Sequence, residues 1–275
     1  MRVCEGVYLP ASDWAGLDDR GRHLAAAHAA QRSRQRRLVF SHWTAAAAWG
    51  LPLIEGLPPR VHAVAPRSSG GRTDDHLVRH CVGVPEQTAE IEGLEVTSLA
   101  RTVVDLARVA RFATAVAAAD AGLVRLSSRD ELAAELGPSG LRGVGRARRV
   151  VEFADPRSGS PGESLSRASM SVAGVPAPEL QHAFRDREGR MVVDFWWPRF
   201  GVVGEFDGAV KYDDPVFLAG RSPQQALLDE KAREDRIRAL GPTVTRWRWD
   251  VAGSPARLRA QLIAAGVRDV RYRTW

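Results

Sequence analysis

Cysteine and long apolar runs are scarce in this chain of 275 residues. The two cysteines, Cys4 and Cys81, form no disulfide or metal-binding pattern, so we expect a reducing compartment. The longest apolar stretch, residues 44–54, is too short to cross a bilayer and contains Gly50 and Pro52. Because the first residues also lack the apolar region of a secretory signal, these absences predict a cytoplasmic protein with no membrane partner.

Lysine is nearly absent as well. Of 39 basic residues only Lys211 and Lys231 are lysines, and the others are arginines. A planar guanidinium cannot replace a compact ammonium at every position. The two lysines are therefore candidates for a site that needs an ammonium group.

Arginine, by contrast, is abundant, and the net charge of +6 favours a polyanionic partner. Six arginines and no acid lie within residues 20–37, and a second cluster spans residues 142–149. Such clusters are either solvated helix faces or contacts to nucleic-acid phosphates. The residues that we expect to contact DNA are Arg32, Arg34, Arg36, Arg37, Arg146, Arg148, Arg149 and Arg233.

The length predicts two domains, because 275 residues exceed the usual size of one. Residues 155–162 are rich in proline, glycine and serine, so we expect domains at residues 1–154 and 155–275. The first domain is predicted to be mainly helical with a small sheet. Its expected helices are 20–38, 41–49, 99–108, 111–123, one that opens at 127–131, and 139–153, and its expected strands are 3–10, 61–65 and 77–82.

The second domain has a different order of elements. Its expected elements are a helix at 163–173, strands at 179–185, 190–197 and 202–207, a helix at 223–240, a strand at 243–249 and a helix at 255–265. This order predicts an α/β (α+β) fold in which a mixed sheet is flanked by helices.

Three carboxylates lie in two neighbouring strands of the second domain. Asp194 interrupts the apolar strand 190–197, and Glu205 and Asp207 lie in the strand 202–207. A tight turn between them would place Asp194 opposite Glu205, where paired side chains are about 5 Å apart. Two such carboxylates need a shared proton or a cation, and Mg²⁺ is a common hard cation beside phosphates. The alternative is that a carboxylate pairs with one of the many arginines.

Glu163 is a fourth candidate acid. Residues 160–163 read Ser-Pro-Gly-Glu, which is a capping box at the start of a helix. The glutamate could therefore serve only to cap the helix, or it could also point toward the sheet.

At this point the residues show a family resemblance. The segments SPGESLSR, GVPAPELQ, VVDFWWP, VVGEFDGAVKY and DEKAREDRIRALG…VTRWRWD, in this order, resemble the very-short-patch-repair-like branch of the PD-(D/E)XK nuclease superfamily over residues 160–250. The resemblance implies that Asp194 and Glu205 bind a metal ion and that Glu163 is the acid of the first helix. It also places Asp207 where the superfamily has a lysine, so Lys211 or Lys231 would have to replace that lysine.

The first half is similar to proteins with AbiEi-type antitoxin domains, through GVYLP, SHWTAAAAWGLPL and TSLARTVVDLAR. Together the two resemblances imply a Mg²⁺-dependent DNA endonuclease, for which Mn²⁺ substitutes. Two alternatives stay open, namely a DNA-binding regulator or antitoxin with an inactive nuclease fold, and a protein-interaction module of a defence system. A homodimer and a toxin or defence-system partner also stay open.

The histidines of the first half give no functional signal. His42 and Trp43 are expected to pack in the core. His62, His76 and His80 lack the spacing of metal ligands.

Overall fold

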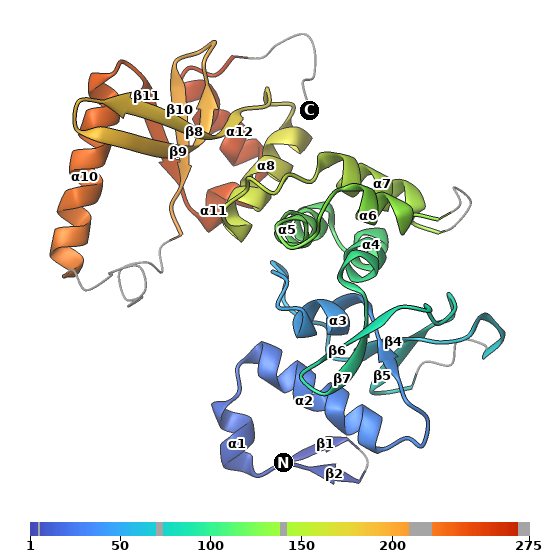
Figure 1. Ribbon diagram of the computed structural model, residues 1–275. Helices are drawn as coiled ribbons and strands as arrows, with labels where there is room; N and C mark the ends of the chain where they lie inside the picture. Colours follow the sequence, from blue (N-terminus) through green and yellow to red (C-terminus); the bar gives the residue numbers. More distant parts are fainter. Residues whose placement is uncertain (5, 70–73, 138–141, 209–221, 269–275) are drawn as a thin grey trace. The chain divides into compact units, whose positions relative to one another are not determined.

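The computed structural model describes residues 1–275 except 5, 70–73, 138–141, 209–221 and 269–275. The chain divides into two compact units, Met1–Pro156 and Arg157–Trp275 (Figure 1). The division lies two residues after the boundary expected from the sequence. Within the described residues, no helix combines the length and the apolar character needed to cross a membrane.

Unit 1 contains two sheets. Its larger sheet has five strands in the order β5-β4-β3-β7-β6, and a separate hairpin is formed by β1 and β2. The strands are β1 (Arg2–Cys4), β2 (Val7–Tyr8), β3 (Val39–Phe40), β4 (Val61–Val64), β5 (Leu77–His80), β6 (Thr88–Ile91) and β7 (Leu94–Thr97).

Helices complete two hydrophobic cores in unit 1. The helices are α1 (Ala11–Gly16), α2 (Asp19–Arg32), α3 (His42–Ala48), α4 (Leu99–Val109), α5 (Phe112–Leu123), α6 (Asp130–Ala134) and α7 (Val144–Phe153), with a short 3-10 helix at Arg67–Ser69. In one core, Leu24 and Ala27 of α2 pack against Phe40 and Leu77 of the sheet. The other core joins α4, α5 and α7. The prediction of a mainly helical region with a small sheet is confirmed.

Two predictions about unit 1 were wrong in detail. The helix expected over residues 20–38 ends at Arg32, because the amide of Leu38 is bound by the Gln31 side chain and the chain turns into β3. The hairpin β6–β7 was not predicted. Its turn is made by Glu92 and Gly93, which both have positive φ angles of 50° and 74°. Two consecutive residues with positive φ angles suit a two-residue hairpin turn. In the sequence only the single glycine indicates such a turn.

Unit 2 is a mixed four-stranded sheet with helices on both faces, as the sequence predicts. Its elements are α8 (Pro161–Ala173), β8 (Glu179–Asp186), β9 (Gly189–Trp197), β10 (Val202–Phe206), α10 (Pro223–Ala239), β11 (Thr243–Trp247), α11 (Trp249–Ala252) and α12 (Pro255–Ala264). The strand order is β11-β10-β9-β8. β8, β9 and β10 are antiparallel, and β11 runs parallel to β10.

The two faces of this sheet bury different residues. Val203 and Val244 pack against Ile237 of α10 on one face. Because side chains alternate along a strand, Gly204 and Trp247 lie on the other face. There Trp247 donates a hydrogen bond of 2.8 Å to Ser166 of α8.

Helix α8 approaches this second face closely. A Cβ atom on Gly162 would lie 2.0 Å from the ring of Phe206, so only glycine allows this contact. The close approach fixes the start of α8, and with it Glu163, against the end of β10.

Candidate functional site

The central feature of unit 2 is the hairpin of β9 and β10. Val202 pairs with Trp197, Val203 with Trp196 and Gly204 with Phe195. The turn is therefore centred between Arg199 and Phe200, and the predicted register is confirmed. Continued by one position, this register would oppose Asp194 to Glu205, but the paired residues end at Gly204 and Phe195. There the Asp194 carboxylate accepts a hydrogen bond of 2.8 Å from the amide of Phe206.

Glu205 is buried, with 6% of its surface exposed, and arginines bind both of its carboxylate oxygens. Arg246 lies beside it on β11, with Nη2 2.8 Å from Oε2. Arg233 reaches from α10, with Nη2 2.5 Å from Oε1 and 2.6 Å from the carbonyl oxygen of Val192. The pairing of a carboxylate with arginine, which the sequence left open, is thus present at Glu205.

Further acids of α10 complete this ion-pair network. Glu230 Oε1 lies 3.0 Å from Arg233 Nη1 and 2.6 Å from Arg246 Nη2. Glu234 Oε2 lies 2.9 Å from Arg246 Nε. We call Glu205, Glu230, Glu234, Arg233 and Arg246 the Glu205 network.

The two guanidinium groups of the Glu205 network stay charged. Burial acts to lower the pKa of Arg233, but the hydrogen bond and charge of Glu205, then the charges of Glu230 and Asp194, raise it above its ordinary value. For Arg246, burial is likewise outweighed by Glu205, Glu230 and Glu234, and its pKa is raised.

Glu163 caps its helix, as one of the two predictions stated. Its amide donates to Ser160 Oγ at 3.2 Å, and its carboxylate accepts from Ser160 Oγ and from the amide of Gly159, both at 2.9 Å. Gln181 of β8 donates a third hydrogen bond at 2.9 Å. Gln181 lies between the paired positions Leu180 and His182 of β8 and links Glu163 of α8 to this strand.

The remaining candidate site residues do not join the Glu205 network. The carboxylate of Asp207, just after β10, lies 3.6 Å from Arg248 Nε. Lys231 is exposed, because the helical turn of α10 directs Glu230, Arg233 and Glu234 toward the sheet instead. Lys211 lies outside the described residues. Arg233, expected to contact DNA, is bound to Glu205.

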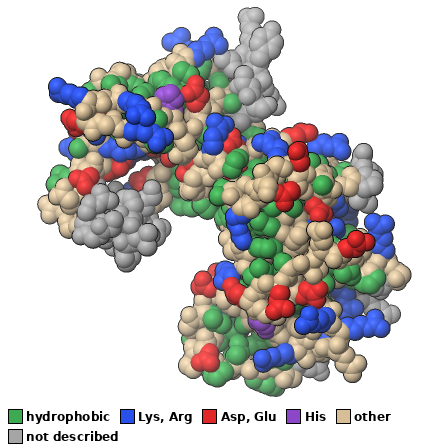
Figure 2. Space-filling view, in the orientation of Figure 1, with side chains coloured by type: hydrophobic (Ala, Val, Ile, Leu, Met, Phe, Trp, Pro, Cys, Tyr) green, Lys and Arg blue, Asp and Glu red, His purple; other side chains and the backbone are tan. Residues whose placement is uncertain are grey.

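The other arginines expected to contact DNA have varied surroundings. Arg34 is paired with Asp74 at 2.6 Å, and Arg37 is 79% exposed in its side chain and 3.9 Å from Glu95. Arg149 stacks over the Phe112 ring. Exposed arginines also include Arg32, Arg36, Arg146 and Arg148. Figure 2 shows basic side chains scattered among acidic ones in this view.

The donor chemistry at Asp194 and Glu205 suits Mg²⁺, because both supply hard carboxylate oxygens from neighbouring strands. However, among the described residues no group of three or more histidine, cysteine, aspartate or glutamate side chains is arranged to hold a metal ion. A cation at Glu205 would also have to displace at least one guanidinium. The residues therefore fit a metal ion by their chemistry, in competition with Arg233 and Arg246.

A cluster of buried histidines in unit 1 was missed by the sequence analysis. His62 Nδ1 lies 2.8 Å from His80 Nε2, and the ring of His42 stacks on that of His80 with centroids 3.6 Å apart. Parallel pairing of β4 with β5 brings the first two together, and α3 adds the third. Because the three histidines are far apart along the chain, their spacing did not indicate that they would form a cluster. The prediction that His42 packs in the core is confirmed.

All three histidines are neutral near pH 7. Burial first, and then the charges of His80, His62, Arg101 and Arg108, lower the pKa of His42 well below its ordinary value. Burial, and then the charges of His80, His23 and Arg60, lower the pKa of His62 to about 3. Burial lowers the pKa of His80 to about 4.

These shifts predict that acid destabilises unit 1. The unfolded chain binds protons at histidine near pH 6.5, whereas the folded chain does not until about pH 4, so stability is lost as pH falls through this window. Between pH 7.5 and 5, we expect His62 to account for a loss of about 2 kcal/mol. We expect the free energy of unfolding to depend less on pH in His62→Gln than in the wild type. Urea unfolding, followed by hydrogen exchange in β4 and β5, measures this dependence. His76→Gln, at an exposed position, is the control, and equal pH dependence in all three proteins would contradict this prediction.

Comparisons with known proteins give two relatives. They are uncharacterized proteins of Mycobacterium tuberculosis: MT2308 of strain CDC 1551 / Oshkosh and Rv2248 of strain ATCC 25618 / H37Rv. Each is 30% identical to this chain over 223 residues. Each match covers 80% of this chain and 78% of the relative. No family model matches the chain, and no solved structure matches it.

Proposed function

We propose that this chain, which belongs to the same family as the Mycobacterium tuberculosis proteins MT2308 and Rv2248, is a Mg²⁺-dependent DNA endonuclease. The observation that carries the proposal is the position of Asp194 and Glu205 next to the last paired residues of β9 and β10, where the Asp194 carboxylate accepts a hydrogen bond from the amide of Phe206. The mixed sheet with helices on both faces supports it as well. The motif resemblance over residues 160–250 supplies the reaction, hydrolysis of phosphodiester bonds.

Asp194 and Glu205 would hold the Mg²⁺ ion, which Mn²⁺ could replace, with Glu163 nearby through Gln181. When bound, the ion would polarise the scissile phosphate and lower the pKa of its bound water. The chain's own residues have separate roles. Arg233 and Arg246 pair with the buried Glu205 carboxylate before a cation binds, and their guanidinium groups are suited to phosphate oxygens. Lys211 and Lys231 remain candidates to replace the missing motif lysine.

DNA would be bound through arginines that are exposed and lie outside the Glu205 network, such as Arg36, Arg37 and Arg148. We further propose a cytoplasmic protein. A homodimer and a toxin or defence-system partner are additional proposals that follow from the resemblance of the first half.

Cleavage of supercoiled plasmid DNA by the purified full chain tests the proposed activity. We expect nicked and linear products with Mg²⁺ or Mn²⁺ and none with EDTA, because the carboxylates need a cation before phosphate can approach. Cleavage in EDTA would contradict metal dependence. An unchanged plasmid under all these conditions would contradict the endonuclease proposal.

A second candidate is a DNA-binding regulator or antitoxin that does not cleave. Two observations favour it. Both carboxylate oxygens of Glu205 are bound by arginines, and Asp207 stands at the position where the nuclease superfamily has a lysine. Salt-dependent DNA affinity without cleavage would support it. Absence of DNA affinity would instead favour a protein-interaction module.

A further inference from the structure

Unit 1 contains a pocket that is separate from the carboxylates of unit 2. It lies where β3 begins and where the parallel strands β4 and β5 end, beside Val39, Val64 and Arg79. Its volume is about 470 Å³, which is within the usual range for small-molecule sites. We call it the arginine pocket.

The lining of the arginine pocket is basic and contains no acid. Four arginines line it, namely Arg34, Arg36, Arg37 and Arg79. Asp74 already neutralises Arg34, and Glu95 lies 3.9 Å from Arg37. Arg36 is exposed and makes no ion pair within the part of the chain that the structure describes. The pocket therefore has positive charge available for an anion.

Arg79 supplies the strongest sign of a missing ligand. Its Nε atom is buried, and no acceptor for it lies among the described residues. A buried donor without an acceptor is costly, and a charged donor more so. An anion in the pocket would remove this cost, since a guanidinium binds phosphate with well-matched geometry.

Apart from Gln35, the rest of the wall is apolar, and an apolar wall discriminates among anions. Leu38, Val64, Pro66 and Val84 line the pocket together with the arginines. An inorganic anion would leave these side chains without contact, whereas a flat heterocycle would cover them.

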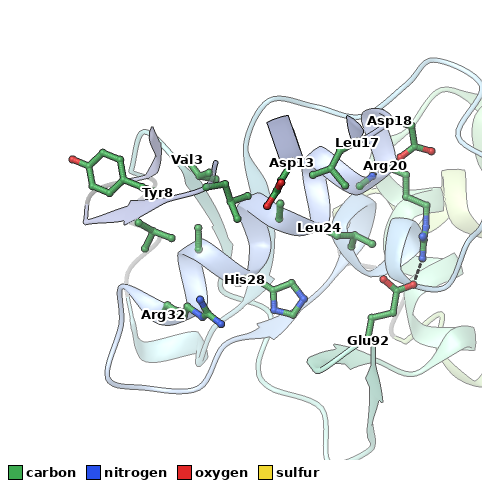
Figure 3. A pocket seen from close by; sticks show the side chains of 15 residues that line it. Val3, Tyr8, Asp13, Leu17, Asp18, Arg20, Leu24, His28, Arg32 and Glu92 are labelled. Atoms are coloured by element: carbon green, nitrogen blue, oxygen red, sulfur yellow. Dashed lines mark hydrogen bonds and ion pairs between the residues drawn. The ribbon is translucent and has the colours of Figure 1, made fainter. Parts of the chain in front are cut away.

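A larger pocket in unit 1, of about 610 Å³, lacks these features. It lies between the β1–β2 hairpin and α2, and its lining mixes acids such as Asp13 with basic residues such as Arg32 (Figure 3). Its Arg20 is paired with Glu92. This lining favours neither sign of charge, so it does not select an anion.

We propose that the arginine pocket binds a nucleotide, with the phosphate at Arg79 and Arg36 and the base against the apolar wall. The nucleotide could be a free nucleoside monophosphate or an unpaired nucleotide of a nucleic-acid strand, which present the same chemistry. The site uses residues of unit 1 only. It therefore stands or falls independently of cleavage at Asp194 and Glu205.

Calorimetric titration of the full chain in EDTA tests the proposal with four probes. These are deoxyadenosine monophosphate, a 5′-phosphorylated ten-nucleotide single strand, deoxyadenosine and inorganic phosphate. We expect the nucleotide or the strand to bind at least about 10-fold more tightly than deoxyadenosine or phosphate alone. A preference for the monophosphate would identify a free nucleotide as ligand, and a preference for the strand would identify nucleic acid.

Three variants locate the binding. Arg79→Gln is expected to weaken it about 10- to 100-fold, through loss of a charged hydrogen bond. Val84→Asp changes a side chain that is 50% exposed, so folding should persist while the added negative charge weakens binding. Arg60→Gln removes an exposed arginine of unit 1 outside the pocket lining and is the matched control. Wild-type affinity in both pocket variants, an equal loss in the control, or phosphate binding as tightly as the nucleotide would overturn the proposal.

Discussion

Asp194→Asn is expected to reduce Mg²⁺-dependent cleavage of plasmid DNA by about 100-fold or more, in line with the loss of a charge-stabilising group from an active site. The amide oxygen can still accept the hydrogen bond from the Phe206 amide, so the hairpin should keep its structure. Only the negative charge that would attract a cation is lost. Single-turnover nicking rates at saturating Mg²⁺ measure the effect.

Asp235→Asn is the matched control for this variant, because Asp235 is an exposed acid on α10 in the same unit. It should cleave at the wild-type rate. DNA affinity should be unchanged or tighter in Asp194→Asn, since an acid that repels phosphate has been removed. Binding of Mn²⁺, followed by electron paramagnetic resonance, should weaken in parallel. Wild-type cleavage by Asp194→Asn would show that any activity arises elsewhere.

Glu205→Ala is expected to destabilise unit 2 by about 3 kcal/mol, the lower end of the cost of removing one partner from a buried ion pair. The substitution leaves Arg233 and Arg246 close together without the carboxylate that lies between them. We take the lower end because both arginine side chains remain 28% exposed, which lets water solvate them. Urea unfolding, followed by hydrogen exchange of β9 and β10, measures the loss.

A second substitution separates ion pairing from packing. Adding Arg246→Met to Glu205→Ala removes one of the two like charges. We expect the double variant to regain part of the lost stability, and a double-mutant cycle measures this gain. Glu188→Ala is the control, because that side chain is 61% exposed and should change stability by less than about 0.5 kcal/mol. If Glu205→Ala is as stable as the wild type, the Glu205 network does not hold the sheet to α10.

Local patterns predicted much of unit 2. The serine and proline at residues 160 and 161 fixed the start of α8, and the breakers between Trp197 and Val202 fixed the hairpin turn. Once the turn is fixed, antiparallel pairing determines which residues oppose each other, so the pairing of Val202 with Trp197 and of Gly204 with Phe195 could be derived from the sequence. The hairpin β6–β7 escaped notice because its turn residue Glu92 is not a usual turn residue.

The sequence by itself determined the order of the elements, the two-unit division and the register of the β9–β10 hairpin, because each depends on residues close together along the chain. Only the tertiary structure decided the partners of the carboxylates in this hairpin. Arg246 contacts Glu205 because β11 lies parallel beside β10. Arg233 contacts Glu205 because α10 directs the Arg233 side chain toward the sheet. The histidine cluster and the buried Nε atom of Arg79, which has no acceptor among the described residues, likewise depend on the parallel pairing of β4 with β5. Pairing between strands distant in sequence is set by the burial of whole faces, which leaves no local signal at the individual polar residues that it brings together.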